Sequence, residues 1–146
     1  MLQSDRSASL FVRVLYEYRT QGKFRLHEFV AMPDHFHLLL TLHSSLTIER
    51  AVQFVKGGFA FRAGRELGFQ APVWQKGFSE MRVLEREAFR NIAEYIRNNP
   101  VRRHLVQEAP EFPYSSAHVG FVLDPAPQGL KPVVCSALDG IAKAMP

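Results

Sequence analysis

Apolar side chains recur at helical spacing in two segments of the first half of the chain. The first segment covers residues 4–21, and Gly22 is a natural stop, so a helix is predicted there. Thr47 can cap a second helix, whose apolar stripe runs through Phe59 and which is expected to end at Gly68.

The residues between these two helices have the pattern of a β-hairpin. Residues 24–32 alternate as a strand does, which places Leu26 and Val30 on the same face. Residues 35–42 form a mostly apolar run, and only the turn signal Pro33–Asp34 separates the two segments. Two strands with so short a link are expected to pair antiparallel.

The second half of the chain contains short strand-like pieces within residues 73–84 and then a third helical stripe. This helix is predicted from about Glu85 to Asn99 and to be closed by Pro100, because the residue before a proline is pushed away from the helical region. Interleaved helices and antiparallel strands predict an α+β fold for a domain of residues 1–120. Residues 121–146 are rich in Pro, Ala and Gly and are expected to form a loose C-terminal tail.

Length and composition are those of one globular domain. The chain has 146 residues, of which 47% are hydrophobic and 22% are charged, enough to bury a single core. No stretch approaches the roughly 18 apolar residues of a membrane span, so no membrane partner is expected. The N-terminus lacks the apolar core of a signal peptide, and the single Cys135 cannot form an internal disulfide. These features predict a cytoplasmic protein.

The net charge of +4 is concentrated in the middle of the chain. Residues 50–103 carry eleven Lys or Arg and five Asp or Glu, whereas the flanking segments are neutral or slightly acidic. Clustered cations favour polyanions through counterion release and electrostatic steering. Solvated helix faces are also often rich in Lys and Arg, so charge alone leaves both a nucleic-acid surface and an ordinary solvated face open.

His35 and His37 stand two residues apart at the start of the second predicted strand. Side chains i and i+2 share a face of a strand, so both imidazoles point the same way while Phe36 points into the opposite core. Two imidazoles on one face can converge on a divalent ion, or they can be two half-buried histidines that bond their neighbours. A zinc site with His27 or His43 as a third ligand is a further interpretation, which the absence of a nearby cysteine disfavours.

Tyr95 and Asn99 lie four residues apart on the third predicted helix, so they stack on one flank of it. A tyrosine there lies at the border between core and solvent, either as an ordinary border residue or as a nucleophile. Asn99 adds a neutral oxygen, which a hard cation such as Mg²⁺ accepts beside imidazole. The negative end of the helix dipole repels phosphate at this place, a cost that a cation and neighbouring arginines would have to offset.

Four sequence blocks together resemble one known family. They are Met32-Pro-Asp-His-Phe-His-Leu-Leu-Leu40, Val73-Trp-Gln-Lys-Gly-Phe78, Tyr95-Ile-Arg-Asn-Asn-Pro-Val-Arg102 and Phe112-Pro-Tyr-Ser-Ser116. In this order they resemble the single-tyrosine transposases of the HUH superfamily (named for its His–hydrophobe–His motif), including the REP-associated ones. The likeness covers about residues 5–118, and four blocks in order are specific where one would be weak.

The resemblance implies a ferredoxin-like α+β fold, with the histidine pair on a central strand and the helices packed on one face of the sheet. It implies that His35, His37 and Asn99 hold a divalent ion, Mg²⁺ or Mn²⁺, and that Tyr95 is the nucleophile. Tyr95 would attack a phosphodiester of single-stranded DNA and form a 5′-phosphotyrosine link. The 3′-hydroxyl that is freed could then rejoin strands without ATP.

The same resemblance implies a partner, single-stranded DNA that contains a hairpin, for a monomer or homodimer with a cytoplasmic, nucleoid-associated location. The basic middle third would hold this strand by its phosphates. Six cations are the candidates for DNA binding: Lys56, Arg62, Lys76, Arg97, Arg102 and Arg103. Three aromatic residues could stack on bases or belong to the core: Trp74, Phe78 and Tyr114.

The chain departs from the family pattern at both ends. Members of the family begin with an additional strand before the first helix, next to the histidine strand, and this chain starts almost at that helix. The first strand is therefore expected to be missing, which leaves one sheet edge unpaired and weakens the metal geometry or the stability. In the segment after Phe78, Glu80 is a candidate for assisting proton transfer or the metal, and the tail from about Phe121 matches nothing in the family.

Three functions remain open on the sequence. The first is a DNA strand-transfer enzyme that uses Tyr95. The second is a non-catalytic relic that keeps the fold and binds single-stranded nucleic acid, and the third is a small zinc- or ligand-binding α+β protein whose charge is incidental. The joint presence of His35, His37, Tyr95 and Asn99 favours the first function over the third. It does not separate the first from the second.

Overall fold

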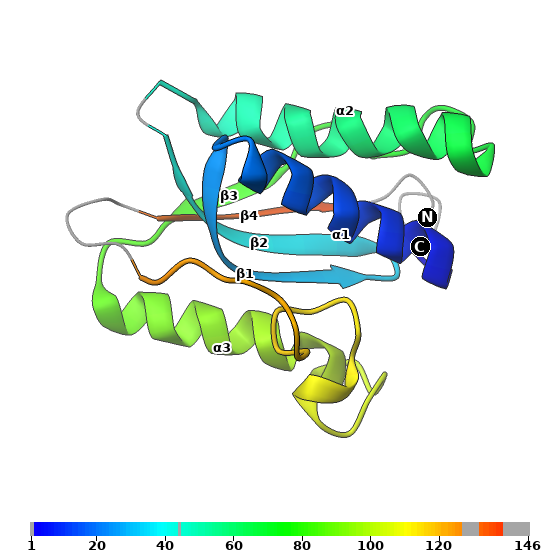
Figure 1. The fold of residues 1–146 in the computed structure, drawn as a ribbon. Helices are drawn as coiled ribbons and strands as arrows, with labels where there is room; N and C mark the ends of the chain where they lie inside the picture. The colour runs from blue at the N-terminus through cyan, green and yellow to red at the C-terminus, as the bar shows by residue number, and fades with distance from the viewer. Residues whose placement is uncertain (1, 44, 127–131, 139–146) are drawn as a thin grey trace.

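The computed structural model of the chain describes residues 2–43, 45–126 and 132–138. Its elements, in chain order, are α1 (Asp5–Thr20), β1 (Phe24–Met32), β2 (His35–Leu42), α2 (Ile48–Leu67), β3 (Ser79–Arg82), α3 (Arg86–Arg102), the short 3₁₀ helix η1 (Ala109–Glu111) and β4 (Val133–Leu138). The strands form one antiparallel sheet in the order β1-β2-β4-β3. The expected α+β fold with a ferredoxin-like arrangement is confirmed (Figure 1).

Local capping signals set the ends of the first two helices where the sequence predicted them. The hydroxyl of Ser4 accepts the backbone N–H of Ser7 at the start of α1. Thr47 caps α2 in the same way through the N–H of Arg50, and Gly68 ends that helix with a φ of 73°. Glycine adopts this left-handed conformation without the steric cost that a side chain would add.

Helix α3 continues past the stop that was predicted at Pro100 and ends at Arg102. A proline lacks the amide hydrogen of one i→i−4 bond, which favours a helix end but does not require one at that residue. The chain stays in the helical path because the N–H of Arg103 donates to the carbonyl of Asn99, and the N–H of Leu105 donates to that of Pro100. None of the helices in the described ranges is long and apolar enough to cross a membrane.

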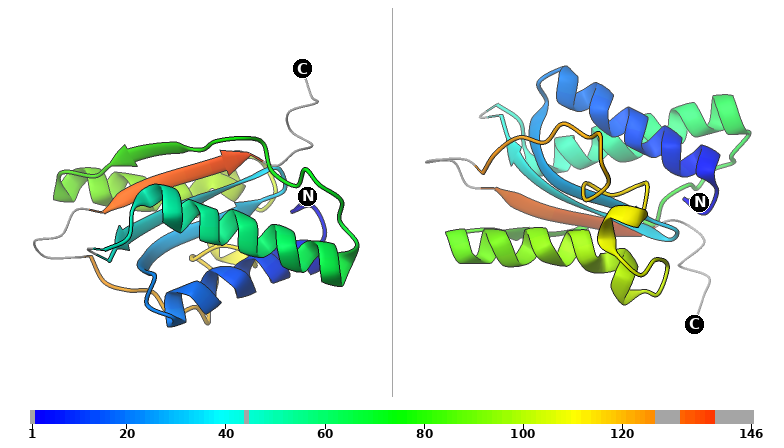
Figure 2. Two further views of the ribbon diagram at one scale, coloured as in Figure 1. Left: turned by 90° about the horizontal axis from the view of Figure 1, so that it is seen from above. Right: turned by 60° about the horizontal axis from the view of Figure 1, so that its bottom comes forward.

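The helices cover both faces of the sheet, so the expectation that they pack on one face is wrong (Figures 1 and 2). Helices α1 and α2 lie on one face, over a core that includes Phe11 and Phe59. Helix α3 lies on the other face, where Ile96 is buried with Val30 and Leu39. The reason is that β1 and β2 carry apolar residues on both faces, and each face has to be covered.

A β-bulge in β1 changes which of its residues face the same core. The register with β2 shifts between Leu26 and Glu28, so the alternation restarts after His27. Leu26 and Phe29 are buried on the side of α1 and α2, whereas Val30 is buried on the side of α3. The prediction that Leu26 and Val30 share a face is therefore wrong.

The segment that was expected to be a loose tail contributes β4 to the sheet. This strand lies between β2 and β3 and pairs with both, and Val133, Cys135 and Ala137 are buried in the core under α1 and α2. It occupies the place beside the histidine strand that the missing first strand was expected to leave open, so β2 has a partner on each side. The Pro, Ala and Gly content of the tail suggested a loop, but its residues 133–138 are a mostly apolar run that suits a central strand. Residues 127–131 and 139–146 of the predicted tail lie outside the described residues.

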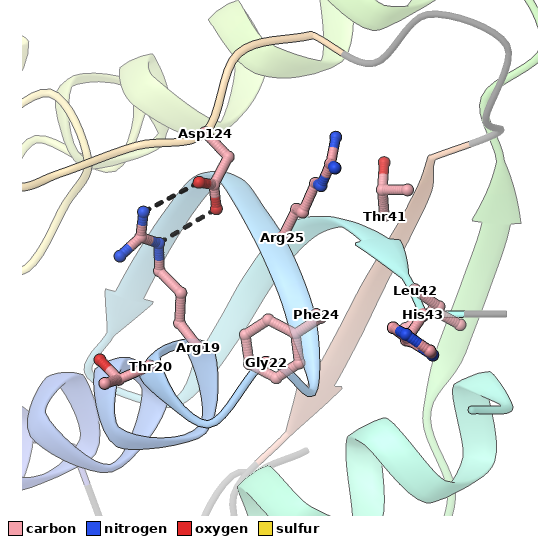
Figure 3. Close-up of a pocket in the computed structure, with 9 residues that line it drawn as sticks. All are labelled: Arg19, Thr20, Gly22, Phe24, Arg25, Thr41, Leu42, His43 and Asp124. Carbon is pink, nitrogen blue, oxygen red and sulfur yellow. Dashed lines mark hydrogen bonds and ion pairs between the residues drawn. The ribbon is translucent and has the colours of Figure 1, made fainter. Parts of the chain in front are cut away.

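The residues ahead of β4 are also docked on the domain. Both carboxylate oxygens of Asp124 accept hydrogen bonds from the guanidinium of Arg19, at 2.8 and 3.0 Å (Figure 3). The same carboxylate accepts the backbone N–H of Leu26 at 2.7 Å, and Phe121 stacks on Tyr16. A boundary at residue 120 therefore does not separate a folded unit from a loose tail.

Asp124→Asn is expected to lower the free energy of unfolding by about 1–3 kcal/mol, because the bonds from Arg19 and Leu26 lose their anionic acceptor. Burial alone raises the pKa of Asp124, but the hydrogen bonds from Arg19 and Leu26 hold this pKa below its ordinary value. The contribution is thus present above the unfolded-state pKa and is lost as the pH falls through the folded-state pKa. Urea denaturation at pH 7 and at pH 3 measures both effects.

The matched control for this prediction is Glu66→Gln, which breaks an exposed ion pair with Arg62. Exposed pairs of this kind contribute little, so its unfolding midpoint should stay close to that of the parent. A loss of stability in Asp124→Asn no greater than that in the control would contradict the docking of this segment.

Candidate active site

His35 and His37 lie on β2 and face α3. The residues that alternate with them, Phe36 and Leu38, are buried in the opposite core, so the predicted sharing of a face is confirmed. The centroids of the two imidazole rings are 4.7 Å apart and the rings are inclined by 76°. The pair is therefore close enough for both rings to serve one ligand.

A neighbour holds the Nδ1 atom of each imidazole. His35 Nδ1 lies 2.6 Å from Asp34 Oδ1, and His37 Nδ1 lies 2.5 Å from the hydroxyl oxygen of Ser136 on β4. Within residues 2–43, 45–126 and 132–138, the hydrogen bonds of both rings use Nδ1, which leaves both Nε2 atoms available as ligands. Burial, with the nearby His35 and Arg103, lowers the pKa of His37 to about 4. This imidazole is thus neutral at pH 7, the form that binds metals.

Helix α3 brings Tyr95 to the same pair. Its ring centroid lies 5.7 Å from that of His37, with the rings inclined by 71°. The guanidinium carbon of Arg102 lies 4.8 Å from the centroid of the Tyr95 ring. Tyr95 is 45% exposed, so its ring is open to solvent on one side while it packs edge-on against His37.

The position of Tyr95 follows from how α3 docks on the sheet. Ala93 and Ile96 are buried against the strands. One residue further along, the guanidinium of Arg97 donates to the carboxylate of Glu28 on β1 at 2.7 Å, and Glu28 also accepts the hydroxyl of Ser116. These contacts fix the rotation of the helix about its axis, which directs Tyr95 toward β2.

Asn99 lies one helical turn beyond Tyr95 and is buried. Its Oδ1 atom is the one buried side-chain nitrogen or oxygen in the described part of the chain that has no hydrogen-bond partner. Leaving such an atom unsatisfied costs about 1–3 kcal/mol, so the structure favours a further group at this place. Imidazole nitrogens and an amide oxygen are donor types that a divalent cation such as Mg²⁺ or Mn²⁺ accepts.

The structure does not bring a third histidine to the pair. The two ring nitrogens of His27 contact the carbonyl of Asp124 and the hydroxyl of Thr41, at 2.9 and 2.8 Å. His43 follows the far end of β2, about 20 Å along the strand from His37. Among the residues that the structure describes, no group of three His, Cys, Asp or Glu could hold a metal, so a cation at the pair needs a ligand of another kind.

A groove of about 490 Å³ opens beside the histidine pair. Lys76 and Ser136 line it together with the two histidines. The loop of residues 75–78 forms one side of this groove. Lys56 holds the loop in place, because its ammonium group donates to the carbonyls of residues 75 and 77 at 2.9 and 2.8 Å. A larger groove of about 610 Å³ lies at the other end of the hairpin; His43 lines it, and none of His35, His37, Tyr95 and Asn99 does (Figure 3).

The six predicted DNA-binding cations fall into two groups. The first group is bonded within the protein: Lys56, Arg62 and Arg97. The second group borders the site: Lys76 lines the groove, Arg102 lies over the Tyr95 ring, and the charge of Arg103 acts on His37.

The remaining candidates divide between core and site. Trp74 packs edge-on against three phenylalanines of the core under α1 and α2. Phe78 lines the groove, and the hydroxyl of Tyr114 donates to Asp5. Glu80 pairs in register with Cys135, and paired residues share a face, so its side chain lies on the face opposite the histidines.

Comparison with known proteins shows the family of the chain. The family model described as "Transposase IS200 like" matches residues 2–99. A curated REP-associated tyrosine transposase of Haemophilus influenzae is 27% identical over an alignment 131 residues long that covers 78% of this chain and 74% of that protein. A second, from Escherichia coli, is 25% identical over 96 residues, or 65% of this chain and 55% of that protein. No solved structure matches the chain. Since the family match contains the histidine strand, Tyr95 and Asn99, the protein belongs to the family of IS200-like transposases.

Proposed function

We propose that this protein cleaves and rejoins single-stranded DNA, with Tyr95 as the nucleophile and a divalent cation held by His35, His37 and Asn99. Membership of a transposase family implies a DNA partner. The observation that carries the proposal is the contact between the Tyr95 and His37 rings, because a nucleophile and a cation have to meet at one phosphate. The names of both relatives, as tyrosine transposases, support the same chemistry.

In the proposed step the phenolic oxygen of Tyr95 attacks the phosphorus of a phosphodiester. A bond forms between that oxygen and phosphorus, and the bond between phosphorus and the 3′ oxygen breaks. Tyr95 loses its proton and the departing 3′ oxygen gains one, which gives a 5′-phosphotyrosine link and a free 3′-hydroxyl. Attack by a 3′-hydroxyl on the link reverses the step, and no ATP is needed because the link is itself a phosphodiester.

Bound Mg²⁺ or Mn²⁺ would supply Lewis-acid stabilisation of the charge that develops on the phosphate. The ligand set fits this role, since the Nε2 atoms of both histidines are available and the buried oxygen of Asn99 has no partner. Arg102 and Arg103 follow at the C-terminal end of α3, where their charges offset the negative end of the helix dipole.

The strand is proposed to follow the groove beside the histidines. Lys76, Arg102 and Arg103 are the cations assigned to its phosphates, because they border the groove or Tyr95. Lys56, Arg62 and Arg97 would act on DNA only through the segments that they hold. We propose that the protein recognises its DNA target by a hairpin in the single strand.

Tyr95→Phe is expected to abolish a DNA adduct that resists denaturation. Hairpin-bearing single-stranded oligonucleotides labelled at either end are incubated with the protein and Mn²⁺ and separated on a denaturing gel. A 5′-phosphotyrosine link predicts that the 3′ label migrates with the protein and that the 5′ label appears in a shorter free strand. Tyr18→Phe is the control that should keep the adduct, because Tyr18 packs against α2 on the opposite face.

Two results would contradict the proposal. An adduct that persists in Tyr95→Phe would assign the nucleophile to another residue. A parent protein that binds the oligonucleotides and forms no adduct with any of them would favour the non-catalytic nucleic-acid-binding relic.

A further inference from the structure

Strand β4 delivers a side chain to the histidine pair. In the register between β2 and β4, Ser136 is the direct partner of His37, and paired residues of an antiparallel sheet project from the same face. The Ser136 hydroxyl oxygen lies 2.5 Å from Nδ1 of His37 and lines the groove beside it. A residue 99 positions later in the chain thus makes the hydrogen bond that holds one of the two imidazoles.

This bond holds the orientation of His37, and it suits the tautomer that a cation needs, in which Nδ1–H donates and the hydroxyl oxygen accepts. A neutral imidazole that donates Nδ1–H to a hydroxyl has its lone pair on Nε2, the atom directed away from β4. Without a partner on Nδ1 the ring can turn about its side-chain bonds and can carry its proton on either nitrogen. His35 has an anionic partner in Asp34, whereas the partner of His37 is neutral, so the two ligands differ in strength as well as in position.

We propose that Ser136 is a positioning residue of the cation site: it holds His37 with Nε2 toward the divalent ion, so that β4 completes the site. This inference rests on the proposed function, because it takes the histidine pair as the ligands of a cation. Partners of this kind usually change metal affinity by about 10–100-fold when they are removed. Ser136 thus makes a segment at residues 133–138 part of the working site, although it lies outside the residues of the family match.

The test measures the affinity for Mn²⁺ by isothermal titration calorimetry in the absence of DNA. Ser136→Ala is expected to weaken binding by about 10–100-fold. Ser136→Thr keeps the hydroxyl group. Ser136→Val has nearly the shape of the threonine variant but lacks the hydroxyl, so comparing these two variants isolates the effect of the hydrogen bond. Thr should bind within about threefold of the parent and Val should resemble Ala. Should Ser136→Ala fail to fold, the comparison of Thr with Val carries the test.

A matched control removes a similar contact elsewhere. Ser45→Ala deletes a hydroxyl that lies 3.1 Å from Nδ1 of His43, beyond the far end of β2, and should leave Mn²⁺ binding unchanged. A second readout is independent of metal. In ¹H–¹⁵N spectra of the imidazoles, His37 should be protonated on Nδ1 in the parent and in Ser136→Thr, and should become a mixture of tautomers in Ser136→Val.

The outcomes separate this inference from the proposed function. If the parent binds Mn²⁺ and the folded Ser136→Val binds it equally well, Ser136 has no positioning role and the proposed function stands. If the parent binds no Mn²⁺, the cation site and the role of Ser136 fall together. Weaker binding in Ser136→Val than in Ser136→Thr, with the tautomer change, supports the inference.

Discussion

A variant that ends at residue 132 is expected to lose its cooperative unfolding transition at 25 °C, because the strand that it lacks lies inside the sheet. Removing β4 leaves β2 and β3 about 10 Å apart, which is twice the distance between neighbouring strands. Backbone N–H and C=O groups of both strands are then unpaired. It also removes Val133, Cys135 and Ala137 from the main core. Burial of a side chain as large as Val133 is worth about 1.5–3 kcal/mol, and each lost backbone hydrogen bond to β2 or β3 adds about 0.5–1.5 kcal/mol. The summed loss approaches the whole stability of a typical domain.

Circular dichroism and urea denaturation of the truncated chain measure this effect. A synthetic peptide of residues 131–140 should restore part of the transition when it is added in excess, and a scrambled peptide should not. Unfolding at the parent midpoint without the peptide would show that β4 is dispensable for the fold.

The double variant His35→Ala with His37→Ala is expected to lose Mn²⁺ binding and at least a thousandfold in the rate of adduct formation. Lewis-acid stabilisation at a phosphate is worth several kcal/mol, and each 1.36 kcal/mol is a factor of ten. Affinity for single-stranded DNA should fall less than about tenfold, because it depends mainly on the cations that neutralise phosphates. Calorimetry, gel analysis of the adduct and fluorescence anisotropy of a labelled strand measure the three quantities.

His43→Ala is the control for this variant, since His43 lies beyond the far end of the same strand and its imidazole hydrogen-bonds only Ser45 among the described residues. The double glutamine variant of the pair keeps more of the side-chain volume and tests whether a cavity causes the effect. Cleavage at the parent rate in either double variant would remove the cation from the mechanism. An equal loss of adduct and of DNA affinity would make the histidines DNA contacts instead.

The parts of the structure that rest on short-range signals could be predicted from the sequence. Ser4 and Thr47 start helices because a hydroxyl can satisfy backbone amides, and the hairpin follows from the short link at Pro33–Asp34. The shared face of His35 and His37 follows from the period of a strand. These features depend on residues only a few positions apart.

The parts that depend on distant residues could not be predicted in the same way. The bulge at His27 reverses the faces of β1, and its partners arrive from β2 and from Asp124. Ser136 was missed because nothing local marks residues 133–138 as a neighbour of β2. One signal could have found it: the histidine strand was expected to have one unpaired side, and residues 133–138 are a short, mostly apolar run that could pair there.

The order of the strands also has a consequence during translation. The histidine strand leaves the ribosome about 90 residues before the segment that will lie beside it, which at 5–20 residues per second is about 5–20 s. During this interval one side of β2 has no permanent neighbour, and pairing over so long a separation is slow. If the proposed function holds, a nascent copy would therefore cleave no DNA until β4 has left the ribosome and the sheet can close.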